Sequence, residues 1–225
     1  MGQKVNPINF RVGVIYGWKS KWFNKRKYRE YLREDVNIRE LLMKTLREAG
    51  CEKIEIDRSG EQVTVTIFSS RPGVIIGRQG DGIEKLKDQI LKLLNGKKNL
   101  KVNVEEVREP NLSAKLVARM VSEQLEKRVG FRRACKQTLE RVMQARAQGA
   151  KIMVSGRLDG SEMSRTEWFA EGKIPLQTLR AKIDFAKDEA MTQSYGKIGV
   201  KVWIYKGEHF DEKPEEKEAN EKKAK

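Results

Sequence analysis

Histidine, cysteine and long apolar runs are scarce in this 225-residue sequence, and each shortage excludes a class of protein. His209 is the only histidine, so no multi-histidine metal site can form, and a Ser/His/Asp set could form only through that residue. Cys51 and Cys135 lie far apart and form no Cys-x-x-Cys pair. We therefore predict a reducing compartment, no metal or other cofactor, and two cysteines that act as small buried apolar groups.

Signals for membranes and for nucleotide hydrolysis are also missing. No apolar run approaches the roughly 20 residues of a membrane-spanning helix. Residues 1–10 have no apolar core of the kind found in a signal peptide. No Walker A sequence occurs, which excludes a P-loop GTPase. The sequence thus predicts a cytoplasmic protein without a membrane partner, and one that is not an enzyme.

Positive charge is what the sequence has in excess. Lysine and arginine number 47 against 32 acidic residues, giving a net charge of +15. The excess is +6 over residues 1–38 (nine basic, three acidic), +2 over 39–107, +8 over 108–210 and −1 over 211–225. Such a charge favours a polyanionic partner, although a merely basic soluble protein is the alternative.

These segments give the predicted organisation. Residues 1–38 form a basic N-terminal arm, 39–107 a first domain, 108–210 a second domain and 211–225 a charged tail. The tail has almost no apolar residues and is therefore predicted to be disordered. In the arm, basic residues alternate with Trp22, Phe23, Tyr28 and Tyr31, which could stack on bases or pack on the core. The arm's candidate RNA-binding residues are Lys4, Arg11, Lys19, Lys21, Trp22, Lys25, Arg26 and Lys27.

The first domain reads as helix, strand, strand, short helix, glycine loop, helix and strand. Asn37 and Glu40 have capping-box spacing and predict a helix that ends near Gly50. Alternating apolar residues predict strands at 54–56, 63–67 and 100–104. The loop Gly77-Arg78-Gln79-Gly80 lies between Val74-Ile75-Ile76 and an amphipathic helix. Two glycines alone fit any tight helix–helix turn, but this whole arrangement resembles a KH domain of the second topological type, whose loop lets a nucleic-acid backbone approach closely.

The second domain is predicted to consist of two helices followed by strands. Asn111 is the expected cap of a helix that runs to Arg128, and a second helix is expected over about 131–148. Arg132, Arg133 and Lys136 project together from the second helix, which indicates either polyanion binding or a solvated face. Strands are predicted at 152–154, 183–185 and 198–204. The fold class is therefore α+β, with a three-stranded KH domain followed by a second domain with a mainly antiparallel sheet.

Several separated motifs resemble the S-three family of bacterial small ribosomal subunit proteins. They occur at 2–7, 71–80, 131–134, 154–158, 165–168, 174–176, 178–181 and 199–203. The resemblance implies a structural protein of the small-subunit head that binds ribosomal RNA and neighbours the tenth and fourteenth small-subunit proteins. It further implies that Arg132, Arg133 and Lys136 contact messenger RNA at the channel entrance and help to unwind it. A free KH-type regulator or assembly factor and a nucleic-acid lyase or nuclease are the competing functions.

Overall fold

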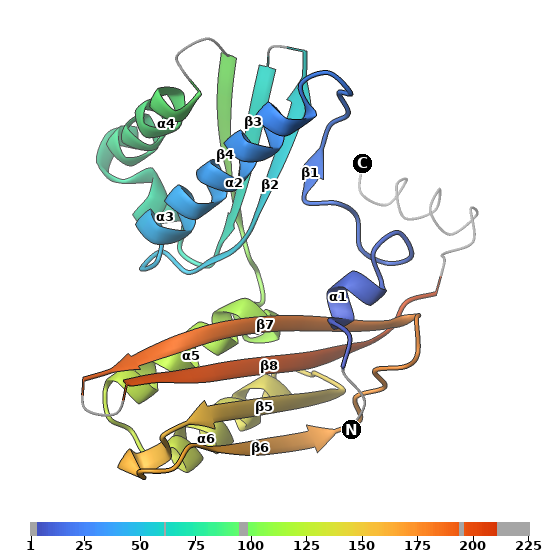
Figure 1. Ribbon diagram of the computed structural model, residues 1–225, viewed down its shortest axis with the longest axis vertical. Coiled ribbons are helices and arrows are strands. Elements are labelled where there is room, and N and C mark those ends of the chain that lie inside the picture. The colour runs from blue at the N-terminus through green and yellow to red at the C-terminus, as the bar shows by residue number, and fades with distance from the viewer. Residues whose placement is uncertain (1–3, 61, 95–98, 194–195, 211–225) are drawn as a thin grey trace.

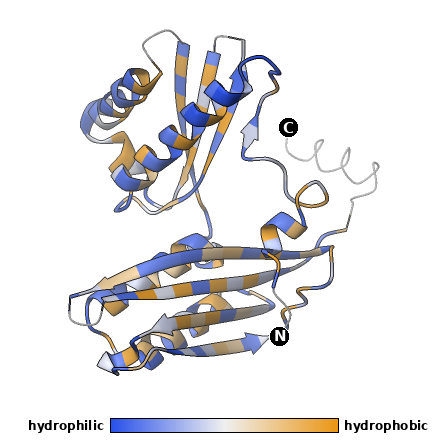
Figure 2. Cartoon of the chain, in the orientation of Figure 1, coloured by the Kyte–Doolittle hydropathy of each residue, from blue (hydrophilic) through white to orange (hydrophobic). Residues whose placement is uncertain are grey.

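Alternating apolar side chains build both sheets of the protein, as the striped strands of Figure 2 show. The computed structural model describes residues 4–60, 62–94, 99–193 and 196–210. In this part of the chain two α+β domains, each with its own core, lie one above the other in Figure 1. The prediction of a two-domain α+β fold is therefore confirmed.

The first domain has a four-stranded sheet in the order β1-β2-β3-β4. Pairs β1/β2 and β3/β4 are parallel, and β2/β3 is antiparallel. The core of this domain contains the fully buried strand residues Ile56, Val65 and Ile67. Ile38 and Ile90, each from a helix, belong to the same buried cluster. The elements are β1 (Ser20–Lys21), α2 (Tyr28–Thr45), β2 (Cys51–Ser59), β3 (Gln62–Ser69), α3 (Pro72–Ile76), α4 (Asp81–Leu93) and β4 (Asn99–Glu106).

The second domain packs two helices on one face of an antiparallel sheet in the order β6-β5-β8-β7. Its main core joins Val117 and Leu139 of the helices to Ile152 and Val202 of the central strands. Its elements are α5 (Ala114–Glu126), α6 (Phe131–Gln144), β5 (Gly149–Gly156), β6 (Arg165–Gly172), β7 (Ala181–Thr192) and β8 (Gly196–Glu208).

The N-terminal segment spans both domains. Its helix α1 (Pro7–Phe10) lies beside β7, and Tyr16 donates a hydrogen bond of 2.8 Å from its hydroxyl to the Ile183 carbonyl. The chain then crosses to the first domain, where β1 adds a fourth strand to the three predicted from sequence. An ion pair of 3.2 Å between Arg47 and Glu126 also connects the domains.

The structure corrects several predicted boundaries. Helix α2 begins at Tyr28, so the predicted cap Asn37 lies inside it. Helix α5 begins at Ala114, whose amide donates to the carboxylate of Asp184 on β7, so Asn111 is not its cap. Helix α6 ends at Gln144 rather than near 148.

Strand β6 was missed because its inner residues include Glu167, which interrupts the apolar alternation. The predicted tail, 211–225, lies outside the described residues. None of the helices in the described ranges is long and apolar enough to cross a membrane.

Candidate nucleic-acid interface

The glycine loop is an exposed turn between α3 and α4. Gly77 and Gly80 have φ angles of 71° and 91°, and Gln79 also has a positive φ of 53°. Gly80 is the N-cap of α4 and supplies no capping side chain, so backbone amides at this helix start are available to a phosphate. Arg78 is exposed beside them. The loop therefore has the backbone and the charge that contact with a nucleic-acid strand requires.

Helix α6 presents the three predicted channel residues on its outer side. Arg132, Arg133 and Lys136 are all exposed. The opposite side of the helix, which includes Phe131 and Cys135, is buried against the sheet. Within the described chain, neither Arg133 nor Lys136 forms an ion pair. The helix is therefore anchored by its apolar side and leaves a basic side for a polyanion.

Glu167 on β6 holds Arg132 at the edge of this surface. Its carboxylate accepts hydrogen bonds from Arg132 at 3.5 Å and from Arg165 at 2.9 Å. Desolvation alone would raise the pKa of Glu167, but the two arginines outweigh it and lower that pKa. The carboxylate therefore stays ionised at neutral pH and orients Arg132 without neutralising Arg133 or Lys136.

Of the two roles that the sequence allows Trp22, stacking on bases or packing on the core, the structure shows the packed one. Its indole Nε1 donates to the buried Asp35 at 2.8 Å, and its ring lies edge-on to Tyr31 at 5.5 Å. Ser20 and Arg58 donate to the same carboxylate. Asp35 therefore fixes β1 and Trp22 against α2 and β2.

Arg11 is a clear correction to the predicted basic arm. Its side chain is fully buried, and its guanidinium donates to the backbone carbonyls of Pro7, Leu176 and Thr178 at 2.9–3.0 Å. Burial lowers the pKa of this guanidinium. Arg11 therefore joins α1 to the 175–178 segment and is not available to RNA.

The rest of the arm does present charge to solvent. Lys4, Lys19, Lys25, Arg26 and Lys27 are exposed, and Lys21 is exposed but pairs with Glu55 at 3.3 Å. The ring of Phe23, 84% exposed, is available for stacking, unlike that of Trp22. The structure thus separates the arm into a fixed strand and an exposed basic stretch before α2.

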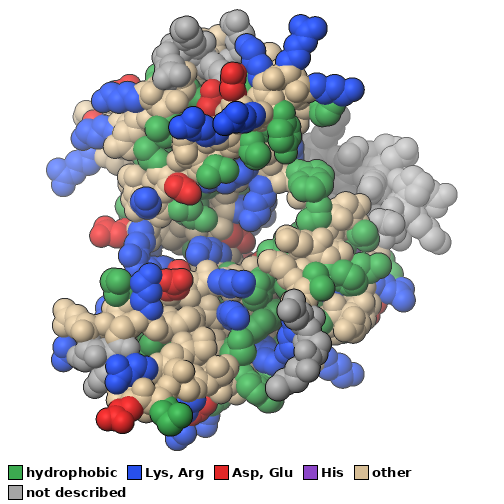
Figure 3. Space-filling model, in the orientation of Figure 1, with side chains coloured by type: hydrophobic (Ala, Val, Ile, Leu, Met, Phe, Trp, Pro, Cys, Tyr) green, Lys and Arg blue, Asp and Glu red, His purple; other side chains and the backbone are tan. Residues whose placement is uncertain are grey.

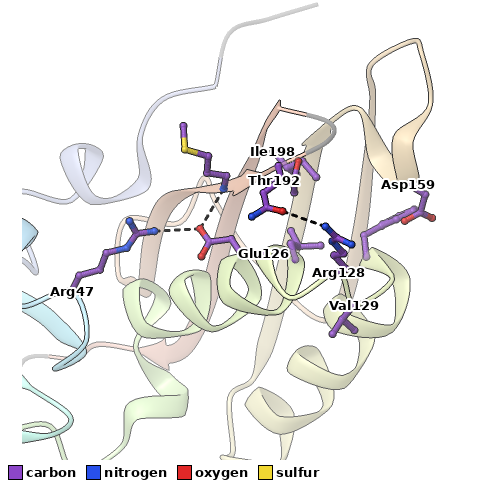
Figure 4. A pocket seen from close by; sticks show the side chains of 11 residues that line it. Arg47, Glu126, Arg128, Val129, Asp159, Thr192 and Ile198 are labelled. Carbon is purple, nitrogen blue, oxygen red and sulfur yellow. Dashed lines mark hydrogen bonds and ion pairs between the residues drawn. The ribbon is translucent and has the colours of Figure 1, made fainter.

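A pocket of about 770 Å³ lies where the first domain meets the end of α5 (Figure 4). Its lining carries charges of both signs: Arg47 pairs with Glu126 at 3.2 Å, Arg128 donates to the neutral Gln193 at 3.2 Å, and Asp159 adds a second carboxylate. The Glu126 carboxylate also accepts from the Met191 amide. Compared with α6, the pocket has little unpaired charge to offer a polyanion.

The two cysteine thiols are inaccessible. Cys51 and Cys135 are both buried free thiols, as predicted. Burial, with a contribution from Glu52, raises the pKa of Cys51 to about 11. Burial, with a contribution from Glu167, raises that of Cys135 to about 12. In the part of the chain that the structure describes, no three His, Cys, Asp or Glu side chains gather as metal ligands.

Two family profiles match the two domains in turn. The profile for the KH domain covers residues 37–112, and that for "Ribosomal protein S3, C-terminal domain" covers 121–204. Small ribosomal subunit protein uS3 of Desulfitobacterium hafniense is 53% identical over 92% of this chain and 94% of its own length. The chain belongs to the uS3 family. The uS3 protein of Syntrophomonas wolfei is 49% identical over 98% of this chain and 99% of its own.

Membership of the uS3 family decides the general function. The family consists of structural, non-enzymatic components of the small ribosomal subunit, and its KH domain is an RNA-binding module. The predictions of a ribosomal, RNA-binding, non-enzymatic protein and of its cytoplasmic location are thereby confirmed. The match over nearly the full length also argues against an isolated KH module.

Sequence reasoning missed two positions that shape these surfaces. Asp35 was hidden inside a helix that was predicted to start too late, although its place beside Trp22 and Arg58 fixes the arm. Gly82 follows the glycine loop, and a Cβ there would lie 2.4 Å from the Ile75 carbonyl oxygen. A third glycine, two positions after the last residue of the GXXG loop, was the available signal for this close helix contact.

Proposed function

We propose that this chain, bound in the small subunit, contacts messenger RNA at the channel entrance through α6 and helps to separate its paired strands. The basic outer side of α6 carries the proposal, because its opposite side is anchored in the core. Arg132, Arg133 and Lys136 lie within about one turn of each other. Three neighbouring cations can hold the phosphates of one strand while its partner is displaced.

In this role the chain binds and positions the messenger strand and supplies no chemical energy. A held strand favours the open form of a messenger hairpin, and the movement of the messenger through the ribosome supplies the work. Glu167 supports this role, since it fixes the direction of Arg132. Arg133 and Lys136 keep full charge for the phosphates.

Replacing Arg132, Arg133 and Lys136 together by alanine is expected to slow translation through a stable hairpin about threefold or more. An unstructured message of equal length should be translated at the unchanged rate. Elongation on both messages would be followed in a reconstituted system. The matched control is Lys44→Ala with Lys92→Ala and Lys101→Ala, which removes three exposed charges from the first domain. Equal rates for triple variant and wild type on the hairpin would refute the proposed role.

We also propose that the GXXG loop, Gly77 to Gly80, binds an RNA backbone, with small-subunit ribosomal RNA as its partner. The uncapped start of α4 and the exposed Arg78 support this. Asp81 lies at the same helix start, but Lys85 pairs with it at 2.6 Å and offsets its charge. Exposed Val74 and Ile76 add apolar surface beside the loop.

Reversing the charge of Arg78 with Arg78→Glu is expected to weaken binding of full-length small-subunit ribosomal RNA. Loss of one phosphate contact should reduce the slope of log affinity against log salt by about 0.9. Filter binding at several salt concentrations measures that slope. Lys92→Glu, at the far end of α4, makes the same charge change away from the loop. If both variants change the slope equally, the loop has no special part in binding.

We also propose that the exposed arm residues bind ribosomal RNA. The tenth and fourteenth small-subunit proteins are the proposed protein neighbours of this chain. Lys4, Lys19, Lys25, Arg26 and Lys27 are placed to neutralise ribosomal RNA phosphates. A sucrose-gradient profile of a cell lysate, probed for this chain, tests whether the protein is a stable component of small subunits. Stable migration with small subunits at high salt is expected, whereas migration at the top of the gradient would favour the free KH regulator.

A further inference from the structure

The second sheet has one face that α5 and α6 do not cover. Strand alternation points Ile152, Val154 and Val202 toward the helices. Their neighbours Lys151, Met153, Lys201 and Trp203 consequently point to the other side. In Figure 1 the strands lie in front of the two helices, so this second face is turned toward the viewer. It is the opposite side of the domain from the basic surface of α6.

Strand register places rings and lysines side by side on this face. One row across the four strands is Trp168, Met153, Lys201 and Lys187. The next row is Ala170, Lys151, Trp203 and Phe185. Neighbours in one row of a pleated sheet lie about 4.5–5.5 Å apart at Cβ, so these side chains form a continuous surface.

Two lysines of this surface, Lys151 and Lys187, contact rings rather than acids. The Nζ of Lys151 lies 4.6 Å from the ring centre of Trp168 and 5.8 Å from that of Trp203. The Nζ of Lys187 lies 5.9 Å from the Phe185 ring, which packs against Trp203 at 5.1 Å. The rings therefore hold the ammonium groups close to the sheet without cancelling their charge.

Positive charge exceeds negative charge on this face, where the carboxylate of Glu189 is already paired with Lys197 at 3.1 Å. Among the described residues, Lys151, Lys187 and Lys201 form no ion pair. Lys187 and Lys201 are direct cross-strand partners, an arrangement of like charges that is destabilising in isolation. Burial lowers the pKa of Lys151, and the nearby charge of Lys4 adds to that effect. Figure 3 shows more Lys and Arg than acidic side chains on the lower domain in this view.

Among the described residues, one end of the face is closed by a small apolar cluster. Ile174 and Leu176 pack with Ile183, Trp203 and Tyr205 there and form a small separate core. At the other side Trp168 is 60% exposed, and Lys187 is also exposed. The open part, which we term the sheet-face patch, consists of Lys151, Met153, Trp168, Lys187 and Lys201.

We propose that the sheet-face patch is a further RNA-binding site, which stacks an unpaired base on Trp168 and holds the adjoining phosphates with Lys151, Lys187 and Lys201. A large exposed ring beside unpaired lysines on a rigid sheet is the composition of a single-strand-binding surface. A protein partner would instead need to bring acidic groups to three lysines. The patch shares no residue with the basic side of α6 or with the glycine loop, so this proposal can be tested separately from the proposals for those two surfaces.

The test uses the full chain and a 12-nucleotide oligouridine that carries 4-thiouridine. After irradiation, a crosslink is expected in the tryptic peptide 166–173, which contains Trp168. By anisotropy, Trp168→Ala should weaken binding about fivefold or more, and Trp168→Phe should restore most of it. Lys187→Ala with Lys201→Ala should reduce the salt slope by about 1.4 and abolish the crosslink. Lys44→Ala with Lys92→Ala is the matched control and should keep the crosslink.

Two results would overturn the proposal. One is crosslinking confined to α6, the arm or the glycine loop, with Trp168→Ala binding the probe as tightly as wild type. The other comes from intact small subunits: if the 166–173 peptide crosslinks only to a neighbouring protein, the patch is a protein-docking surface. A ribosomal RNA crosslink at that peptide in the subunit supports the RNA assignment.

Discussion

Replacing Asp35 by alanine is expected to lower the free energy of unfolding of the first domain by about 3–5 kcal/mol. Asp35 is fully buried, and its carboxylate accepts from Ser20 and Trp22 at 2.8 Å and from Arg58 Nε at 3.0 Å. The Arg58 side chain is only 3% exposed. Without Asp35, Arg58 keeps Glu34 as a partner at 2.6 Å. Two nitrogen donors of Arg58, the Ser20 hydroxyl and the Trp22 indole N–H then lose their acceptor.

Urea unfolding of the full chain measures this loss, and amide hydrogen exchange in β2 and β3 assigns it to the first domain. The matched control is Asp81→Ala, which removes a helical aspartate whose ion pair with Lys85 is exposed. Its effect should stay below about 1 kcal/mol. Asp35→Asn keeps an acceptor without the charge and should fall between the two. A loss for Asp35→Ala no larger than that of the control would show that the buried cluster contributes little.

A methyl group at Gly82 is expected to destabilise the first domain by about 1–3 kcal/mol and to disturb the glycine loop. A Cβ at this position would lie 2.4 Å from the Ile75 carbonyl oxygen and 3.0 Å from that of Ile76. Both are backbone atoms, which cannot turn aside as a side chain can. Helices α3 and α4 would have to separate, and the loop that joins them would move.

Gly73→Ala provides the comparison for Gly82→Ala within the same helix pair. A Cβ at Gly73 meets no atom within 4 Å, and Gly73 lies in α3 with an ordinary φ. Its stability should be unchanged or raised by up to about 1 kcal/mol, since alanine favours the helix. Urea unfolding gives both values, and ribosomal RNA binding reports on the loop. Equal stability for the two variants would mean that α3 and α4 have room to adjust.

The sequence was most informative where function depends on local pattern. Alternation of Val63, Val65 and Ile67 marked a strand because burial on one face repeats every two residues. The glycine loop was visible because two glycines between amphipathic helices need few neighbours to be interpreted. Arg132, Arg133 and Lys136 were placed together by helix periodicity alone, and the structure finds all three exposed on one side of α6.

Capping was less predictable, because the cap can come from distant sequence. Asn111 has a suitable side chain, but α5 takes its acceptor from Asp184, 70 residues further on. Asn37 likewise fits a capping box, yet α2 continues through it because packing of Ile38 and Leu42 on the sheet favours a longer helix. Propensity is a weak prior that tertiary contacts override.

Taken by itself, the sequence determined the two α+β domains, the excess of positive charge and the resemblance to a ribosomal family. These follow from composition, period and local motif, which are properties of neighbouring residues. Only the tertiary structure decided that Arg11 and Trp22 hold the fold while Lys25 and Phe23 face solvent. It alone decided that Trp168, Lys187 and Lys201 share one face. Burial and strand partners depend on residues far apart in the chain, so local pattern cannot specify them.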